Sequence, residues 1–198
     1  MEERALTHTQ KRILITASIV AAVLLAIVLL FGWVVPSVAK LRYKLAYADW
    51  IAAYSRENDL DPYFVCGVIF TESKFNPNAQ SGAGARGLMQ VMPATGAEIA
   101  EALGIAYDPD MLFDPETSIR FGTYYLRQQM NTFDNNSKIV LAAYNAGPHR
   151  ATQWLSDYGL DSKGGIAYIP FGETDRYVDR VLLAQSIYEI LYRGIFTV

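Results

Sequence analysis

The residue best placed for acid–base chemistry is Glu72, which lies near the end of a predicted helix that begins at Asp61-Pro62. Val65, Val68, Ile69 and Glu72 recur at helical spacing, so the glutamate falls on an apolar stripe. Burial and the negative end of the helix dipole both favour the neutral acid, so we expect a raised pKa. Such an acid can protonate a leaving oxygen near neutral pH. The alternative is a boundary glutamate whose carboxylate reaches water.

A glycine-rich loop follows this helix, and it contains Gly82, Gly84 and Gly87 in the order Gly-x-Gly-x-x-Gly. A dinucleotide-binding loop of this pattern requires a strand before it, whereas a helix is predicted there. We therefore expect the glycines to let the backbone approach a bound chain. Ser81 and Gln90 flank this loop segment, and a glutamine side chain can both donate and accept hydrogen bonds.

Two further polar segments could join the same groove. Tyr144 and Asn145 end a predicted helix, and a tyrosine can both pack on a ligand and hydrogen-bond to it. Glu173 begins the last helix, where the positive dipole end favours an ionised carboxylate that could orient a neighbour. Met92 could pack against a ligand, although by itself a methionine is more often part of a core.

The elements that must position these residues are mostly helices. Proline and capping residues predict helix starts at Asp61-Pro62, Pro93, Asp114-Pro115, Ser137 and Thr174. An amphipathic helix is also expected from Tyr43 to Tyr54, and a short helix over 151–158. A brief strand could occur at 166–169. The predicted fold class is mainly α, with a small β component (α+β), in one helical domain over residues 45–193.

An uncharged apolar segment over residues 13–35 precedes this domain, and it is long enough to cross a bilayer as a helix. We expect a membrane anchor, with a short cytoplasmic tail at 1–12 and a juxtamembrane linker at 36–44. Basic residues flank both ends almost equally, so charge does not set the orientation. The alternative is a signal peptide cleaved after Ser37-Val38-Ala39, but the apolar segment exceeds the usual signal core.

Composition excludes several classes of function. The formal net charge is −3 and basic residues do not cluster, which argues against nucleic acid as a partner. The one cysteine, Cys66, lies in an apolar stretch and is expected to be a buried hydrophobe. Neither a disulfide framework nor a Cys/His metal spacing is present, so no Cys/His metal site is expected.

Taken together, four motifs closely resemble the catalytic domain of the soluble lytic transglycosylases, which cleave peptidoglycan and have a goose-lysozyme-like fold. The resemblance covers residues 45–193 and rests on these motifs: Glu72-Ser73, Gly87-Leu88-Met89-Gln90-Val91-Met92-Pro93, Ala143-Tyr144-Asn145-Ala146-Gly147 and Ile169-Pro170-Phe171-Gly172-Glu173-Thr174. The chain differs from the soluble prototype in one respect: it lacks that protein's large helical ring and has a predicted membrane anchor in its place.

The resemblance implies that Glu72 is the sole catalytic acid and then the base, and that no cofactor is needed. It implies cleavage of the MurNAc-β-1,4-GlcNAc bond with formation of 1,6-anhydromuramyl ends. The substrate-binding residues it implies are Ser81, Gln90, Met92, Tyr144, Asn145 and Glu173. Because peptidoglycan lies outside the cytoplasmic membrane, the domain would face the extracytoplasmic side. The alternatives are a hydrolytic muramidase of the same fold and a non-catalytic, membrane-anchored wall-binding scaffold.

Overall fold

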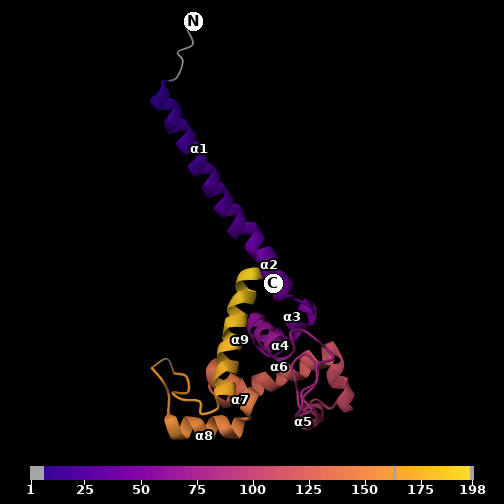
Figure 1. The fold of residues 1–198 in the computed structure, drawn as a ribbon. Helices are drawn as coiled ribbons and strands as arrows, with labels where there is room; N and C mark the ends of the chain where they lie inside the picture. Colours follow the sequence, from indigo (N-terminus) through magenta and orange to yellow (C-terminus); the bar gives the residue numbers. More distant parts are fainter. Residues whose placement is uncertain (1–6, 163, 197–198) are drawn as a thin grey trace. The chain divides into compact units, whose positions relative to one another are not determined.

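The computed structural model describes residues 7–162 and 164–196 (Figure 1). The chain forms two compact units, residues 1–42 and residues 43–198, which are described separately below. Helices dominate both units. Among the described residues, β-structure is limited to three isolated bridges, Gln80 with Arg86, Arg86 with Val91, and Leu160 with Ile166. The predicted mainly α fold is therefore confirmed, and the strand expected at 166–169 is reduced to a single bridge.

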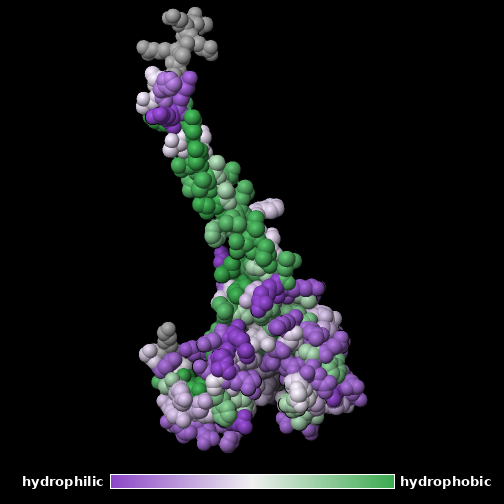
Figure 2. Space-filling model, in the orientation of Figure 1, coloured by the Kyte–Doolittle hydropathy of each residue, from purple (hydrophilic) through white to green (hydrophobic). Residues whose placement is uncertain are grey.

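The first unit is one continuous helical segment made of α1 (His8–Leu29), a π-helical turn (Leu30–Val34) and α2 (Val35–Arg42). A capping box between Thr7 and Gln10 begins it. Within the described residues it is the one helix long and apolar enough to cross a membrane, and Figure 2 shows hydrophobic residues along most of its length. The predicted span 13–35 lies inside this helix, and residues 1–6 of the predicted tail lie outside the described part.

The second unit carries the remaining helices around one core. They are α3 (Ala48–Glu57), α4 (Pro62–Ser73), α5 (Pro93–Leu103), the 3₁₀ helix η2 (Pro109–Phe113), α6 (Pro115–Thr132), α7 (Ser137–Ala146), α8 (Pro148–Tyr158) and α9 (Gly172–Leu191). As predicted, the side chains of Asp61 and Asp114 cap α4 and α6 at their N-termini, each followed by proline.

Three local predictions were wrong. Residues 43–47 are not helical, because Tyr47 has a left-handed backbone and α3 begins only at Ala48. Asn136, rather than Ser137, caps α7 through its side chain. The last helix begins at Gly172, two residues before the expected cap Thr174.

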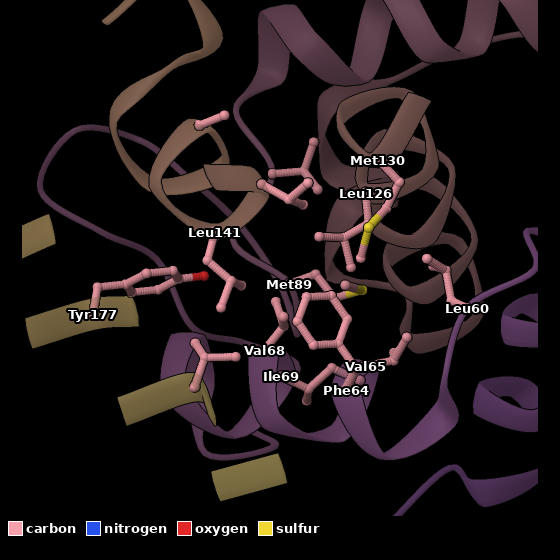
Figure 3. Close-up of a cluster of buried hydrophobic side chains, with 14 of the residues drawn as sticks. Leu60, Phe64, Val65, Val68, Ile69, Met89, Leu126, Met130, Leu141 and Tyr177 are labelled. Atoms are coloured by element: carbon pink, nitrogen blue, oxygen red, sulfur yellow. The ribbon is translucent and has the colours of Figure 1, made fainter. Parts of the chain in front are cut away.

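The core is centred on α4, which contacts α9 more extensively than any other helix of this unit. Phe64, Val65, Val68 and Ile69 of α4 are buried together with side chains from α6, α7 and the loop after α4 (Figure 3). Cys66 is also fully buried, as the sequence predicted, and burial raises the pKa of its thiol. The elements that flank Glu72 are therefore fixed by the main core of the domain.

Candidate active site

Glu72 lies in the last turn of α4, at the edge of the core. The helix ends just beyond it because Lys74 and Phe75 both adopt left-handed backbone conformations. Burial raises the pKa of Glu72 from 4.5 to about 7, even though the hydrogen bond from Tyr177 and the charge of Arg180 lower it. The raised pKa expected from the sequence is confirmed, and its main cause is the removal of the carboxyl group from water.

The partner of Glu72 is Tyr177 of α9, whose hydroxyl donates a hydrogen bond of 2.7 Å to Glu72 Oε1. Tyr177 is almost fully buried. Burial and the nearby Glu72 carboxylate raise the pKa of Tyr177 well above its ordinary value, so the phenol stays protonated and remains a donor. Sequence analysis missed this residue. The signal available was its position next to Val178, on the buried stripe of the helix that begins at the Glu173 motif.

Tyr144 belongs to the same cluster. Its hydroxyl donates a 2.8 Å hydrogen bond to the backbone carbonyl of Met89, which joins the end of α7 to the loop before α5. The pKa of Tyr144 is raised by burial and then by the charges of Glu72 and Tyr125. The electrostatic coupling places Tyr144, Tyr177 and Glu72 close together in the fold, although 72 residues separate Glu72 from Tyr144 in the sequence.

Asn145 and the start of α9 are linked by one hydrogen bond, from the Thr174 hydroxyl to Asn145 Oδ1 at 2.8 Å. Thr174 is buried, and its hydrogen bond connects α9 to α7; it is not the helix cap that was predicted. Glu173 is exposed in the first turn of α9. It is therefore placed at the helix start as predicted, with its side chain in solvent.

The loop after α4 is held by its own polar groups. Ser81 Oγ accepts a hydrogen bond from the backbone of Ala85. Gln90 has a left-handed backbone, with φ of 48°, and its amide donates to the carbonyls of Ala79 and Gly87, each at 3.0 Å. These two predicted binding residues thus also shape the loop that carries them.

The glycines of this loop do not all serve the predicted role. A Cβ at Gly87 would lie 1.8 Å from the carbonyl oxygen of Leu112, and its φ is +74°. Gly87 is therefore required by packing inside the protein and not by the approach of a bound chain. A Cβ at Gly82 or Gly84 would have no other part of the protein within 4 Å, which leaves open space beside both.

A cavity of about 270 Å³ brings together four of the predicted residues, Gln90, Met92, Tyr144 and Asn145. Its walls also include Val91, Ala146 and Gly147, which belong to the quoted motifs, and Thr95 and Tyr125, which the sequence did not single out. Glu72, Ser81 and Glu173 are not part of this lining. Glu72 is linked to the cavity through Tyr144, whose pKa is raised by the Glu72 charge.

Tyr125 is the main addition to the predicted site. Its ring lies 5.4 Å from that of Tyr144, centroid to centroid. Tyr124 and Tyr125 are adjacent on α6, and sequence position alone does not tell which of the two lines the cavity. Met92 is 41% exposed, so its thioether is available to a ligand rather than confined to the core.

The donor set of this region suits hydrogen bonding and proton transfer. Within residues 7–162 and 164–196, His, Cys, Asp and Glu side chains form no cluster of three that could hold a metal ion. A buried acid, two protonated phenols and an amide-lined cavity can bind a polar, ring-shaped ligand and donate a proton to it.

Comparison with known proteins gives one consistent result. The model of the transglycosylase SLT domain family matches residues 49–164. The soluble lytic murein transglycosylase of Salmonella typhimurium is 38% identical over 151 residues, which cover 74% of this chain and 23% of that protein. The membrane-bound lytic murein transglycosylase C of Actinobacillus succinogenes is 34% identical over 121 residues, covering 56% of this chain and 34% of that protein.

Solved structures agree with the sequence relatives. The 70 kDa soluble lytic transglycosylase of Escherichia coli superimposes with a TM-score of 0.72 at 36% identity, over 80% of this chain and 26% of that one. An inactive mutant of the lytic transglycosylase Slt of Pseudomonas aeruginosa gives 0.71 at 33% identity, over 78% and 26%. The chain thus spans about a quarter of the length of the soluble relatives it matches. The family match extends over more than half of the sequence, and the chain belongs to the transglycosylase SLT domain family.

Proposed function

We propose that this chain is a membrane-anchored peptidoglycan lytic transglycosylase in which Glu72 is the single general acid and base. The observation that carries the proposal is the largely buried Glu72 carboxyl, whose pKa of about 7 leaves a substantial protonated fraction near neutrality. The relatives support the reaction class, since they are lytic murein transglycosylases. In the Pseudomonas aeruginosa structure, the inactive mutant carries a glutamine in place of one glutamate.

The proposed reaction has two proton transfers by one residue. Glu72 protonates the oxygen that bridges N-acetylmuramic acid to N-acetylglucosamine, and the glycosidic bond breaks. The carbonyl oxygen of the muramyl N-acetyl group bonds to the anomeric carbon, giving an oxazolinium-like intermediate. Glu72, now a carboxylate, takes the proton from the muramyl 6-hydroxyl, whose oxygen attacks the same carbon. The oxazolinium bond breaks, a 1,6-anhydro ring closes, and Glu72 returns to its protonated form.

A substrate-derived nucleophile removes the need for a second catalytic carboxylate, which an ordinary two-carboxylate glycosidase requires. The other acids that the sequence offered have structural positions instead. Asp61 caps α4 and accepts a 2.7 Å hydrogen bond from Gln185. Glu173 is exposed at the start of α9. One acid with an adjusted pKa therefore accounts for both steps.

The remaining site residues would bind and orient the glycan. Tyr177 would hold the Glu72 carboxyl in place, and Tyr144 would support the N-acetyl group or the intermediate. Gln90, Met92 and Asn145 line the cavity and would contact the sugar directly. For Ser81 and Glu173, the proposed roles are loop shaping beside the groove and maintenance of the start of α9.

The substrate also sets the proposed topology. Peptidoglycan lies outside the cytoplasmic membrane, so residues 13–35 would span the bilayer and residues 45–193 would form the catalytic domain on the extracytoplasmic side. The membrane-bound relative and the apolar helix 8–42 are compatible with this arrangement.

The test is to incubate the purified protein with isolated peptidoglycan and to identify the soluble muropeptides by mass spectrometry. Anhydromuramyl ends, lighter by one water than reducing ends, are expected. Reducing ends would instead identify a hydrolytic muramidase, and binding without soluble products would identify a wall-binding scaffold.

The matched variants are Glu72→Gln and Glu101→Gln. Loss of the acid is expected to lower the rate by roughly 10²–10⁴-fold, whereas Glu101 is an exposed residue of α5 whose replacement should leave the rate unchanged. Substantial activity in Glu72→Gln would show that another group is the acid.

A further inference from the structure

We propose that the C-terminal end of α9 and the turn after it form a second contact with the membrane, against the phospholipid headgroups of the leaflet that faces the catalytic domain. This α9-end surface consists of Lys44, Ile190, Arg193 and Ile195. The proposal rests on the membrane span assigned to residues 13–35 under the proposed function, and it adds a lipid-binding surface on the folded domain itself.

The chain enters the domain at this end of α9. The Tyr192 hydroxyl donates a 2.9 Å hydrogen bond to the carbonyl of Tyr43 and accepts one of 3.2 Å from the backbone of Leu45. The Tyr188 hydroxyl donates to the carbonyl of Lys44 at 3.1 Å. The first residues of the domain are therefore fixed to the last two turns of α9 and cannot act as a loose linker.

The distance from the bilayer to this attachment is short. Tyr43 directly follows Arg42, the last residue of α2. Tyr43 follows Val35, the end of the predicted span, by eight positions, which at 1.5 Å per helical residue is about 12 Å. The headgroup region on each side of a bilayer is about 5–8 Å thick. The first residues of the domain, and the end of α9 to which they are hydrogen-bonded, therefore lie a short chain distance from the predicted span.

The chemistry of the surface fits a membrane interface. Ile190 is 70% exposed and Ile195 is 53% exposed, which is costly in water for large aliphatic side chains. Arg193 lies between them in the sequence and is exposed, and Glu189 is the only acidic residue in the segment 182–196. Lys44 is also exposed, and its carbonyl accepts a hydrogen bond from Tyr188 of α9. Apolar side chains with basic neighbours bind headgroups of anionic phospholipids through both burial and charge.

The turn after α9 presents Ile195 on a fixed backbone. The backbone of Gly194 donates a 3.2 Å hydrogen bond to the Tyr63 hydroxyl, and the rings of Tyr63 and Phe196 lie 5.1 Å apart. The same tyrosine hydroxyl donates to the carbonyl of Tyr192 at 2.9 Å. Ile195 therefore does not need to lose much conformational freedom when it enters the headgroup layer.

This contact would also set the position of the active site. Tyr177, which holds Glu72, lies near the opposite end of α9 from Leu191. The fourteen helical steps from Tyr177 to Leu191 correspond to about 21 Å. With the C-terminal end of α9 against the lipid, the active site would lie at most about 21 Å from the headgroups. It would then act on the glycan strands closest to the membrane.

The experiment uses the full chain in nanodiscs that contain an anionic phosphatidylglycerol fraction. Buried Cys66 is replaced by alanine, and an environment-sensitive fluorophore is attached to Ile190→Cys, Ile195→Cys or the control Leu160→Cys. Leu160 is 58% exposed and lies after α8. Phospholipids with a nitroxide in the headgroup are expected to quench the labels at 190 and 195 several-fold more strongly than the label at 160. Equal quenching at the three positions would overturn the proposal.

A second set of variants separates lipid binding from simple tethering. A flexible Gly/Ser linker is inserted between Arg42 and Tyr43, and the quenching at 190 and 195 is expected to persist with anionic lipid and to weaken several-fold with neutral lipid. Loss of quenching with anionic lipid in the linker variant would overturn the lipid contact. Shielding of the labels by a second copy of the chain in lipid-free detergent would overturn it as well. Muropeptide release measured on the same samples reports on the enzyme separately, so failure of the surface and failure of the proposed reaction are distinguishable.

Discussion

At the scale of single residues, the burial of Glu72 opposes stability. The fold places an acid where its ionised form is poorly solvated, and the hydroxyl of Tyr177 compensates for only part of that cost. The same burial that keeps the proton on the carboxyl near neutral pH makes the ionised protein less stable. The raised pKa of Glu72 leads to two predictions.

The first concerns stability. The pKa of Glu72 is about 7 in the folded protein and near 4.5 when unfolded. Between these values the native state binds more protons, so the free energy of unfolding should fall as pH rises from about 4.5 to about 7, by about 3 kcal/mol from this residue. Denaturant unfolding at a series of pH values should show this decline in the wild type but not in Glu72→Gln. Glu101→Gln should show the same fall of the free energy of unfolding as the wild type. If Glu72→Gln shows the same fall too, groups other than Glu72 cause it.

The second concerns activity. The protonated fraction of Glu72 decreases as pH rises through about 7, so the rate of the first step should decrease over the same range. Tyr177→Phe removes a hydrogen bond that lowers this pKa, so the alkaline limb of the rate profile should move to higher pH. Tyr124→Phe, a half-buried tyrosine on α6, serves as control. If the alkaline limb of the rate profile stays at the same pH in Tyr177→Phe, the hydrogen bond from Tyr177 does not control the pKa of Glu72.

At the scale of elements, the pairing of α4 with α9 positions the site, because these helices carry Glu72 and Tyr177 respectively. Close approach is possible since Gly67 has no side chain. A Cβ at this position would lie 2.7 Å from the carbonyl oxygen of Val181 and 3.0 Å from the backbone nitrogen of Gln185. Backbone atoms cannot rotate away as a side-chain tip can, so the two helices would have to separate.

Gly67→Ala should therefore lower the free energy of unfolding by about 1–3 kcal/mol, the usual cost of overpacking a core. It should also reduce muropeptide release beyond the loss of folded protein, because the hydrogen bond between Tyr177 and Glu72 depends on the separation of the helices. Gly82→Ala is the control for stability, as that position has nothing within 4 Å. Wild-type stability in Gly67→Ala would show that α9 can shift without cost.

At the scale of the whole molecule, the chain combines an apolar helical segment with a folded domain that begins at residue 43. The first residues of the domain are hydrogen-bonded to α9. Retention of residues 1–42 therefore decides where the proposed enzyme can act.

We predict that the segment is retained. Mass spectrometry of the protein recovered from bacterial membranes should give the uncleaved N-terminus, and the protein should resist extraction with alkaline carbonate. A form that begins after Ala39 and is found in the soluble fraction would instead show a cleaved signal peptide. A variant that lacks residues 1–42 is the control for extraction, because it should be released while it retains its folded domain.

The sequence was sufficient for much of the fold and for part of the site. Proline and aspartate at Asp61-Pro62 and Asp114-Pro115 predicted helix starts correctly, because capping depends on neighbours along the chain. The raised pKa of Glu72 was predicted from the apolar stripe on a single helix. Predictions failed where a distant contact decides local structure, as at residues 43–47, whose backbone is bonded to Tyr188 and Tyr192.

By itself, the sequence determined the apolar helix, the helical class of the domain and the presence of an acid on a buried stripe, since each follows from local spacing and hydrophobicity. Only the tertiary structure decided which groups surround that acid. Tyr177 and Tyr125 entered the site because helices far apart in the chain pack together, and Gly87 proved to be required by the Leu112 carbonyl rather than by a ligand. The physical reason is that caps and stripes are properties of one helix, whereas hydrogen-bond partners and cavity walls depend on how several helices meet.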